Sequence, residues 1–157
     1  FSYLADLVVN IAPPNDPNET LFRMIKACLE TSLADETDLA SVQVYFEVWM
    51  LRLGGYLPDW SSCHRCSRKI SDIETTDLDV DYYLLCGSCS RGRGGTKVAP
   101  LYRELIRSAQ IMAPPEFLQF AAEHKEAVHE LSAILKRMIA RSTGNERPIE
   151  RAFTLRG

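Results

Sequence analysis

The sequence predicts a mainly α-helical fold, in which a helical bundle domain carries an inserted module of four cysteines and short β-strands. Apolar residues recur every three or four positions before residue 54 and after residue 100, which is the spacing of helices with one buried face. Proline and glycine pairs divide these stretches into separate helices. Between the stretches lie two C-x-x-C pairs separated by nineteen residues, a spacing that is typical of a metal-binding module.

The first two helices precede residue 35. The first is expected over residues 1–11 and ends before Pro13-Pro14, because its apolar residues are Phe1, Leu4, Val8 and Ile11. The second begins at Asp16-Pro17-Asn18-Glu19, where Asp16 can cap the helix and Glu19 completes a capping box. Its buried face is expected to contain Leu21, Ile25, Cys28, Leu29 and Ser32. On that face Cys28 is most simply a small buried residue.

A third helix follows the acidic connection at residues 35–38 and stops at Gly54-Gly55. Its apolar stripe consists of Leu39, Val42, Phe46, Trp49 and Leu53. An interior helix requires such a stripe, so these aromatic residues predict core packing rather than a platform for nucleic-acid bases.

The candidate metal ligands are Cys63, Cys66, Cys86 and Cys89. Each C-x-x-C places two sulfurs on one tight turn, and two turns supply the four thiolates that a structural zinc ion takes. We therefore predict one structural Zn²⁺, with no coordination site left for a catalytic water. A thioredoxin-type redox pair and disulfides are the alternative interpretations. The first requires a strand–helix–strand unit, and the second leaves Cys28 without a partner.

The cysteine module is expected over residues 61–91, with a short strand at Tyr82-Tyr83-Leu84-Leu85. The stretch at residues 91–97 that follows is basic and rich in glycine, without the spacing of a phosphate-binding loop. It is either a nucleic-acid contact or a solvated linker. His64 is surplus to the four thiolates, and all three histidines are expected at the surface.

Two more helices are expected after the module. One opens at Pro100 and runs to about Met112, and the other covers residues 116–141 with an interruption near His124. The basic tail at residues 147–153 is expected to dock on the body or to contact an acidic partner. We thus expect three parts: residues 1–60, the first part of the helical domain; residues 61–91, the four-cysteine zinc module; and residues 92–157, the second helical part and tail.

The 157 residues match the size of one ordinary domain, and no apolar run is long enough to cross a membrane. We expect a soluble cytoplasmic protein whose natural start lies upstream, because helical periodicity begins at Phe1. The net charge of −3 argues against a strong nucleic-acid binder. Its distribution is uneven, with −6 over residues 1–60, +2 over residues 61–107 and +1 over the remainder.

Several separated segments together resemble one family, the bacterial recombination mediator RecO. The most specific is the helix end and turn at Leu51-Arg52-Leu53-Gly54-Gly55-Tyr56-Leu57-Pro58-Asp59, directly before Cys63-His64-Arg65-Cys66. The second cysteine pair, Cys86-Gly87-Ser88-Cys89, and the closing segments Arg147-Pro148-Ile149 and Arg151-Ala152-Phe153 resemble the family in the same order. The resemblance covers nearly all of the chain.

This resemblance implies a non-enzymatic, nucleoid-associated protein of DNA repair and homologous recombination. RecO-like proteins bind single- and double-stranded DNA, associate with RecR and contact the C-terminal tail of SSB, so that RecA can load on SSB-coated strands. Family members begin with an oligonucleotide-binding barrel that this chain lacks, so weaker DNA binding is expected. The basic candidates for DNA contact are Arg65, Arg68, Lys69, Arg91, Arg93 and Lys97, unless they are ordinary solvated charges. An alternative function is a zinc-containing DNA-binding regulator of transcription, and a third hypothesis is a thiol oxidoreductase.

Overall fold

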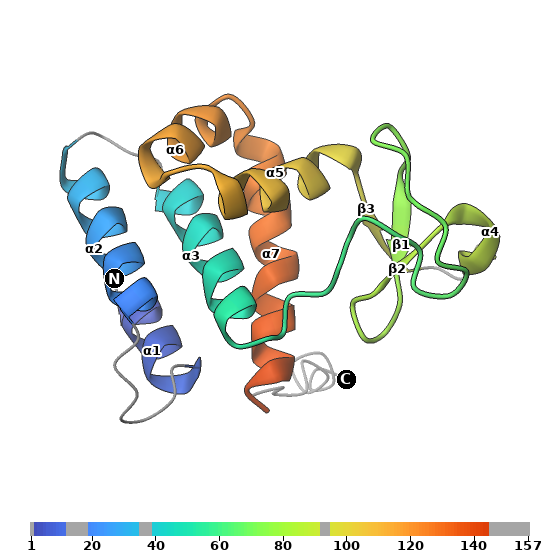
Figure 1. Cartoon of the computed structure of the whole chain (residues 1–157), viewed down its shortest axis with the longest axis horizontal. Coiled ribbons are helices and arrows are strands. Elements are labelled where there is room, and N and C mark those ends of the chain that lie inside the picture. Colours follow the sequence, from blue (N-terminus) through green and yellow to red (C-terminus); the bar gives the residue numbers. More distant parts are fainter. Residues whose placement is uncertain (1, 12–18, 35–38, 92–94, 145–157) are drawn as a thin grey trace, which may run out of the picture.

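The computed structural model describes residues 2–11, 19–34, 39–91 and 95–144. Its elements form a helical body with a small cysteine-containing module at one end (Figure 1). The elements are α1 (Ser2–Ile11), α2 (Glu19–Ala34), α3 (Leu39–Leu53), β1 (Thr76–Leu78), β2 (Leu84–Leu85), α4 (Gly87–Ser90), β3 (Thr96–Val98), α5 (Pro100–Ile111), α6 (Pro114–Ala122) and α7 (Lys125–Ser142). The predicted mainly α-helical class with an inserted module of short strands is confirmed.

Helix α3 is the centre of the body and contacts α1, α2, α5, α6 and α7. A helix surrounded in this way is apolar on most of its circumference, and Val44, Val48 and Leu51 are buried although they lie outside the predicted stripe. The stripe was wrong at its two ends. Leu39 and Leu53, which lie on the first and last turns of α3, are exposed. On α2, Leu29 is exposed whereas Met24 is buried in the face that packs on α3.

In the second half of the chain, proline residues mark the starts of two helices. Pro100 and Pro114 each occupy the first position of a helix, where the missing N–H costs nothing. The predicted interruption near His124 is confirmed. Helix α6 ends at Ala122, and His124, the N-cap residue of α7, has non-helical backbone angles. Helix α7 then runs along α3, and this pair is the most extensive contact between helices.

The module contains a three-stranded antiparallel sheet with the order β2-β1-β3. Asp77 of β1 lies opposite Leu85 of β2 and Lys97 of β3. The strand predicted at residues 82–85 is confirmed only at Leu84–Leu85, whereas β1 and β3 were not predicted. Strands of three residues are too short to show alternation in the sequence, so only pairing in the fold defines them.

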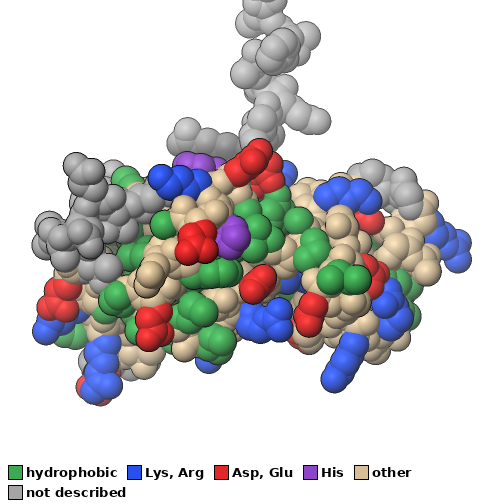
Figure 2. Space-filling model, turned by 90° about the horizontal axis from the view of Figure 1, so that it is seen from above, with side chains coloured by type: hydrophobic (Ala, Val, Ile, Leu, Met, Phe, Trp, Pro, Cys, Tyr) green, Lys and Arg blue, Asp and Glu red, His purple; other side chains and the backbone are tan. Residues whose placement is uncertain are grey.

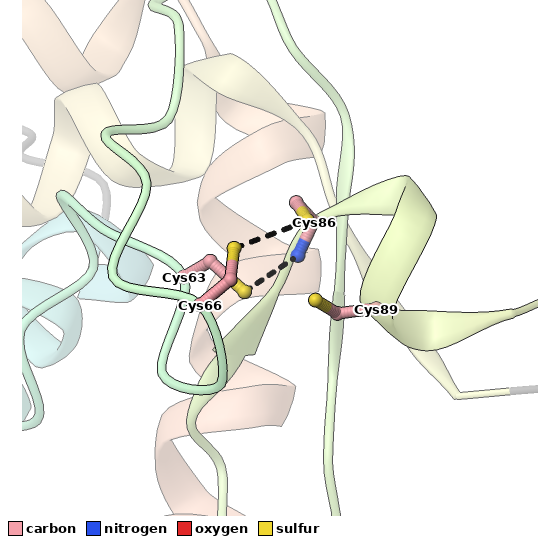
Figure 3. A group of neighbouring side chains, drawn as sticks. All are labelled: Cys63, Cys66, Cys86 and Cys89. Carbon is pink, nitrogen blue, oxygen red and sulfur yellow. Dashed lines mark hydrogen bonds between the residues drawn. The ribbon is translucent and has the colours of Figure 1, made fainter.

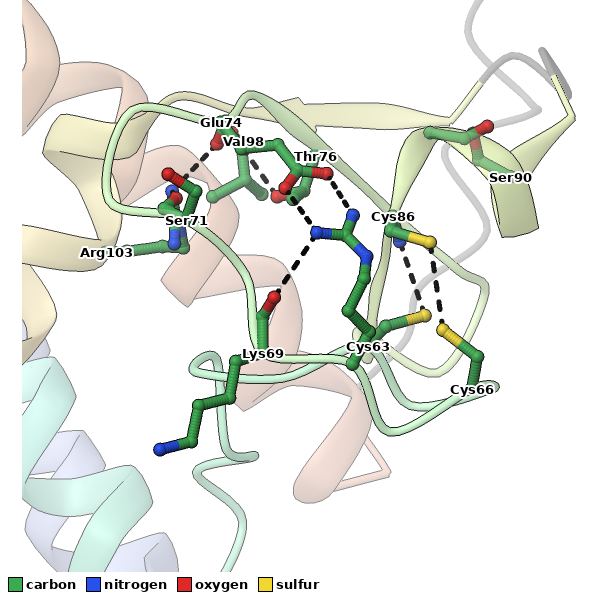
Figure 4. Close-up of polar contacts among 12 residues, drawn as sticks. Cys63, Cys66, Lys69, Ser71, Glu74, Thr76, Cys86, Ser90, Val98 and Arg103 are labelled. Atoms are coloured by element: carbon green, nitrogen blue, oxygen red, sulfur yellow. Dashed lines mark hydrogen bonds and ion pairs between the residues drawn. The ribbon is translucent and has the colours of Figure 1, made fainter.

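The sheet is anchored on the helical body by apolar and polar contacts. Leu78, Leu84 and Val98 belong to the same buried cluster as the helices. The Trp60 indole N–H donates to the carbonyl of Tyr82 over 3.1 Å. From α5, the buried Arg103 donates to the carbonyls of Ser71 and Glu74 over 2.8 and 2.7 Å (Figure 4). The module is therefore held at a defined orientation against α5 and α7.

Replacing Arg103 with methionine is expected to lower the free energy of unfolding by about 2 kcal/mol. The methionine retains most of the buried apolar contact but leaves the two carbonyls of the module loop without their charged donor. Chemical denaturation of both proteins measures the difference. Arg107→Met, which removes an exposed cation one turn further along α5, is the matched control. Equal stability of Arg103→Met and wild type would contradict an anchoring role.

Candidate metal centre

The first cysteine pair lies on a tight turn closed by backbone hydrogen bonds. The N–H of Ser67 donates to the carbonyl of Cys63, and the N–H of Cys63 donates to the carbonyl of Arg68, both over 2.8 Å. Ser67 turns the chain back with a φ of 60°, in the left-handed region. This turn directs the sulfurs of Cys63 and Cys66 to one side.

The second cysteine pair lies at the start of α4. Cys86 is the N-cap residue, and its carbonyl accepts from the N–H groups of Cys89 and Ser90 over 2.9 Å each. Arg91 ends this single turn with a φ of 47°. The Arg65 guanidinium of the first turn donates to the carbonyl of Cys89 over 3.2 Å, which joins the two turns directly.

All four sulfurs meet in one cluster, within 4.8 Å of one another (Figure 3). The Sγ atoms of Cys66 and Cys86 are 3.9 Å apart, and no two described cysteines form a disulfide. Ligands at about 2.3 Å from a tetrahedral ion are separated by about 3.8 Å, so this spacing suits a thiolate-bound metal. The four predicted ligands are brought together, and they can hold a metal ion.

The backbone of the two turns favours the thiolate form of Cys63 and Cys86, whereas contact with the Cys86 side chain raises the pKa of Cys89 to about 12. Burial raises the pKa of the Cys63 thiol, but N–H groups of Cys86, Cys66 and Arg65 outweigh burial and lower it to about 6. The N–H of Cys86 is 3.4 Å from the Cys63 sulfur. For Cys86, burial is likewise outweighed by the N–H of Cys89 and by the Arg68 guanidinium, so its pKa is lowered. Metal ligands must be deprotonated, and these contacts reduce the free energy that deprotonation costs.

The six basic residues predicted to contact DNA are placed differently from one another. Arg68 forms a two-pronged ion pair with Glu74 over 2.7 and 3.0 Å, and the Lys97 ammonium is 2.6 Å from Asp77. Arg65, Lys69 and Arg91 are exposed without an ion pair to a described acid, and the Lys69 side chain extends away from the cysteines (Figure 4). Arg93 lies outside the described residues.

A second group of cations, outside the six predicted DNA contacts, joins Lys69 at a cleft of about 730 Å³ between the module and the body. It comes from α3 and α5 and consists of Arg52, Arg103 and Arg107. Arg103 and Arg107 are four apart on one helix, a signal visible in the sequence, but only the fold brings them to Lys69. Asp59 and Asp72 line the same cleft, and Figure 2 shows basic and acidic side chains interspersed over the module end of the molecule.

The remaining candidate ligands lie away from the cluster or are directed elsewhere. His64 is exposed and stacks on Tyr83, with ring centroids 4.1 Å apart. His124 is half-buried and His129 exposed, both at α7, so the predicted surface position is confirmed for His64 and His129. Cys28 is buried in the helical body as predicted, and burial raises the pKa of its thiol to about 12.

No helix among the described residues is both long and apolar enough to cross a membrane. The family described as "Recombination protein O C terminal" matches residues 1–149. Three curated relatives are each named "DNA repair protein RecO". The relative from Dehalococcoides mccartyi is 21% identical over 134 residues, which cover 85% of this chain and 52% of the relative.

The relative from Pelobacter propionicus is 34% identical over 99 residues, covering 61% of this chain and 39% of the relative. The relative from Koribacter versatilis is 30% identical over 70 residues, covering 45% of this chain and 28% of the relative. The chain therefore spans about half or less of the length of the curated relatives it matches. No solved structure matches it.

Proposed function

This chain belongs to the RecO C-terminal family, and from that premise we propose that it is the helical, metal-holding part of a bacterial recombination mediator that works without catalysing a reaction. The observation that carries the proposal is the family match over residues 1–149, which includes all four cysteines of the cluster. The proposed role is to bind DNA and recombination partners in the bacterial nucleoid, so that RecA loads on SSB-coated single strands.

We propose that the metal is one structural Zn²⁺. The four cysteine sulfurs lie within 4.8 Å of one another, and those of Cys66 and Cys86 are 3.9 Å apart. This spacing suits zinc, which takes four cysteine ligands in closed structural sites. The cluster is packed against the buried Ile70 and bordered by Leu85, so the ion would hold two turns that have a small apolar core of their own. Zinc here would position surfaces and would not activate water.

The proposed partners are single- and double-stranded DNA, RecR and the C-terminal tail of SSB. Exposed cations at the module, Arg65, Lys69 and Arg91, support a contact with phosphates. The ion pairs of Arg68 and Lys97 reduce the charge available for DNA, which supports weak binding by this chain alone. Titration against RecR and against an SSB tail peptide tests the partner proposal. No binding to either at roughly tens of micromolar would overturn it.

Lys69→Ala is expected to weaken single-strand binding and to reduce the slope of log affinity against log salt concentration by about 0.7, the value for one lost phosphate contact. The ammonium of Lys69 is exposed and forms no ion pair with a described acid. Fluorescence anisotropy with a labelled oligothymidylate measures the slope. Lys26→Ala, on α2 at the opposite end of the molecule, is the matched control, since Lys26 pairs with Glu30. An unchanged slope for Lys69→Ala would exclude this contact.

A further inference from the structure

Two solvent-exposed side-chain rings stack on each other at the edge of the module. The imidazole of His64 and the phenol ring of Tyr83 are 4.1 Å apart at their centroids, with an angle of 13° between their planes. His64 is exposed, and Tyr83 is 39% exposed. His64 comes from the first cysteine turn and Tyr83 from the loop before β2, and a backbone hydrogen bond from His64 to Leu84 holds them together.

The loop that presents Tyr83 is held in a strained conformation. Tyr82 has a φ of 63°, which is rare for a bulky side chain. Among the described non-glycine residues, the other two with a positive φ, Ser67 and Arg91, each follow a cysteine pair. Tyr82 lies instead in the turn between β1 and β2, where its N–H donates to the carbonyl of Asp79. Its carbonyl is held by the Trp60 indole, and the Asp79 carboxylate accepts from the N–H of Tyr83 over 2.9 Å. The fold therefore fixes Tyr83 in place at the cost of backbone strain.

The stacked pair, which we call the His64–Tyr83 ridge, separates two surface hollows. On the His64 side lies a hollow of about 830 Å³ that Arg65 and Arg137 also line. On the Tyr83 side lies a hollow of about 670 Å³ lined by Tyr56 and Arg141. Tyr82 borders both hollows, so they are neighbours along one surface.

Charge along this surface is nearly balanced. Asp77 is paired with Lys97, Asp81 with Arg141, and Asp79 accepts two backbone N–H groups. Arg137 is exposed and forms no ion pair with a described acid, and Arg65 donates only to the carbonyl of Cys89 among the described contacts. A ligand at this surface would therefore meet exposed planar rings with two cations beside them. It would not meet a strong positive electrostatic potential.

We propose that the His64–Tyr83 ridge is a stacking site for unpaired bases of single-stranded nucleic acid. Sites of this kind combine aromatic rings with nearby cations, and they tolerate any sequence because every base has a flat face. A base would lie against the outer face of His64, beside Arg65 and Arg137. The inference rests on the proposed DNA binding and adds which residues hold bases rather than phosphates.

Binding of the metal-loaded chain to a labelled oligothymidylate tests the ridge by fluorescence anisotropy over a series of salt concentrations. His64→Ala and Tyr83→Ala are each expected to lower affinity at least about five-fold, the loss of one stacked base, without changing the salt slope. His64→Phe and Tyr83→Phe keep a ring and are expected to retain binding. His129→Ala, which removes an exposed histidine on α7, is the matched control, and metal content is measured for every variant.

A second readout is photochemical. An oligonucleotide with 5-iodouracil is expected to cross-link to Tyr83 or His64, identified in the digested protein by mass spectrometry. Binding that is equal for wild type and both alanine variants would overturn the ridge while leaving DNA binding intact. An SSB tail peptide that loses affinity in the alanine variants, with DNA binding unchanged, would overturn it in favour of a protein contact. If the wild type bound no single strand at low salt, both the ridge and the proposed DNA binding would fail.

Discussion

Removing the proposed zinc ion, by chelation or by Cys86→Ser, is expected to unfold residues near 61–91 while the helices of the body persist. Structural zinc contributes apparent binding energies of about 10–16 kcal/mol in small modules at neutral pH. Among the described residues, the apolar neighbours of the cysteine cluster are Ile70 and Leu85, so little buried apolar surface stabilises the two turns. The body has its own core around α3 and α7, which does not depend on the sulfurs.

Hydrogen exchange, followed segment by segment with and without chelator, locates the loss. The sheet residues Leu78, Leu84 and Val98 pack on the body, so their release is also expected to lower the melting temperature of the whole chain. Cys28→Ser is the control, because it removes a buried thiol far from the cluster and is expected to leave metal content unchanged. Less than about half an equivalent of metal, with a melting curve insensitive to chelator, would refute the zinc centre.

Glu47→Gln is expected to stabilise the protein at neutral pH by up to about 3 kcal/mol and to leave it unchanged near pH 4. Glu47 lies fully buried at the centre of α3, and burial raises the pKa of its carboxyl from 4.5 to about 7. The folded protein therefore binds a proton that the unfolded chain releases at about pH 4.5. Stability is highest below that value and falls as the pH rises towards about 7.

The groups facing Glu47 come from two other helices. From α1, the Tyr3 hydroxyl donates to the Glu47 carboxyl over 2.9 Å. Burial is the larger cause, and the negative charge of Glu47 the smaller one, that raises the pKa of the Tyr3 phenol. From α7, Ser132 donates over 3.1 Å and Lys136 lowers the pKa of Glu47. Glutamine can accept from the Tyr3 hydroxyl with its amide oxygen and donate to the Ser132 hydroxyl with its amide N–H, and it carries no charge, which removes the cost of burying an anion.

Denaturant unfolding of wild type and Glu47→Gln at several pH values between 4 and 8 measures the difference in stability. The difference is expected to grow between about pH 4.5 and pH 7 and then to level off. Glu104→Gln, an exposed carboxyl on α5, is the control and is expected to show little change. A difference between Glu47→Gln and wild type that does not vary with pH would show that Glu47 is not protonated in the folded protein.

The sequence by itself determined the positions of most helices and the composition of the cysteine cluster. Pro100, Pro114 and Gly54-Gly55 act within one turn of their own position, so helix ends could be predicted from them. The four cysteines could be predicted as a group because two residues between paired ligands suit one tight turn each. These features depend on residues that are adjacent in the sequence, so they can be predicted without knowledge of the tertiary structure.

Only the tertiary structure decided which charges and rings are available and which helix lies at the centre. Arg68 and Lys97 looked like free cations in the sequence, but the folded module places Glu74 and Asp77 against them. Glu47, Arg103 and the His64–Tyr83 ridge acquire their environments from segments far away in the chain. Burial, ion pairing and stacking depend on distances between such segments, and no periodicity in one segment encodes those distances.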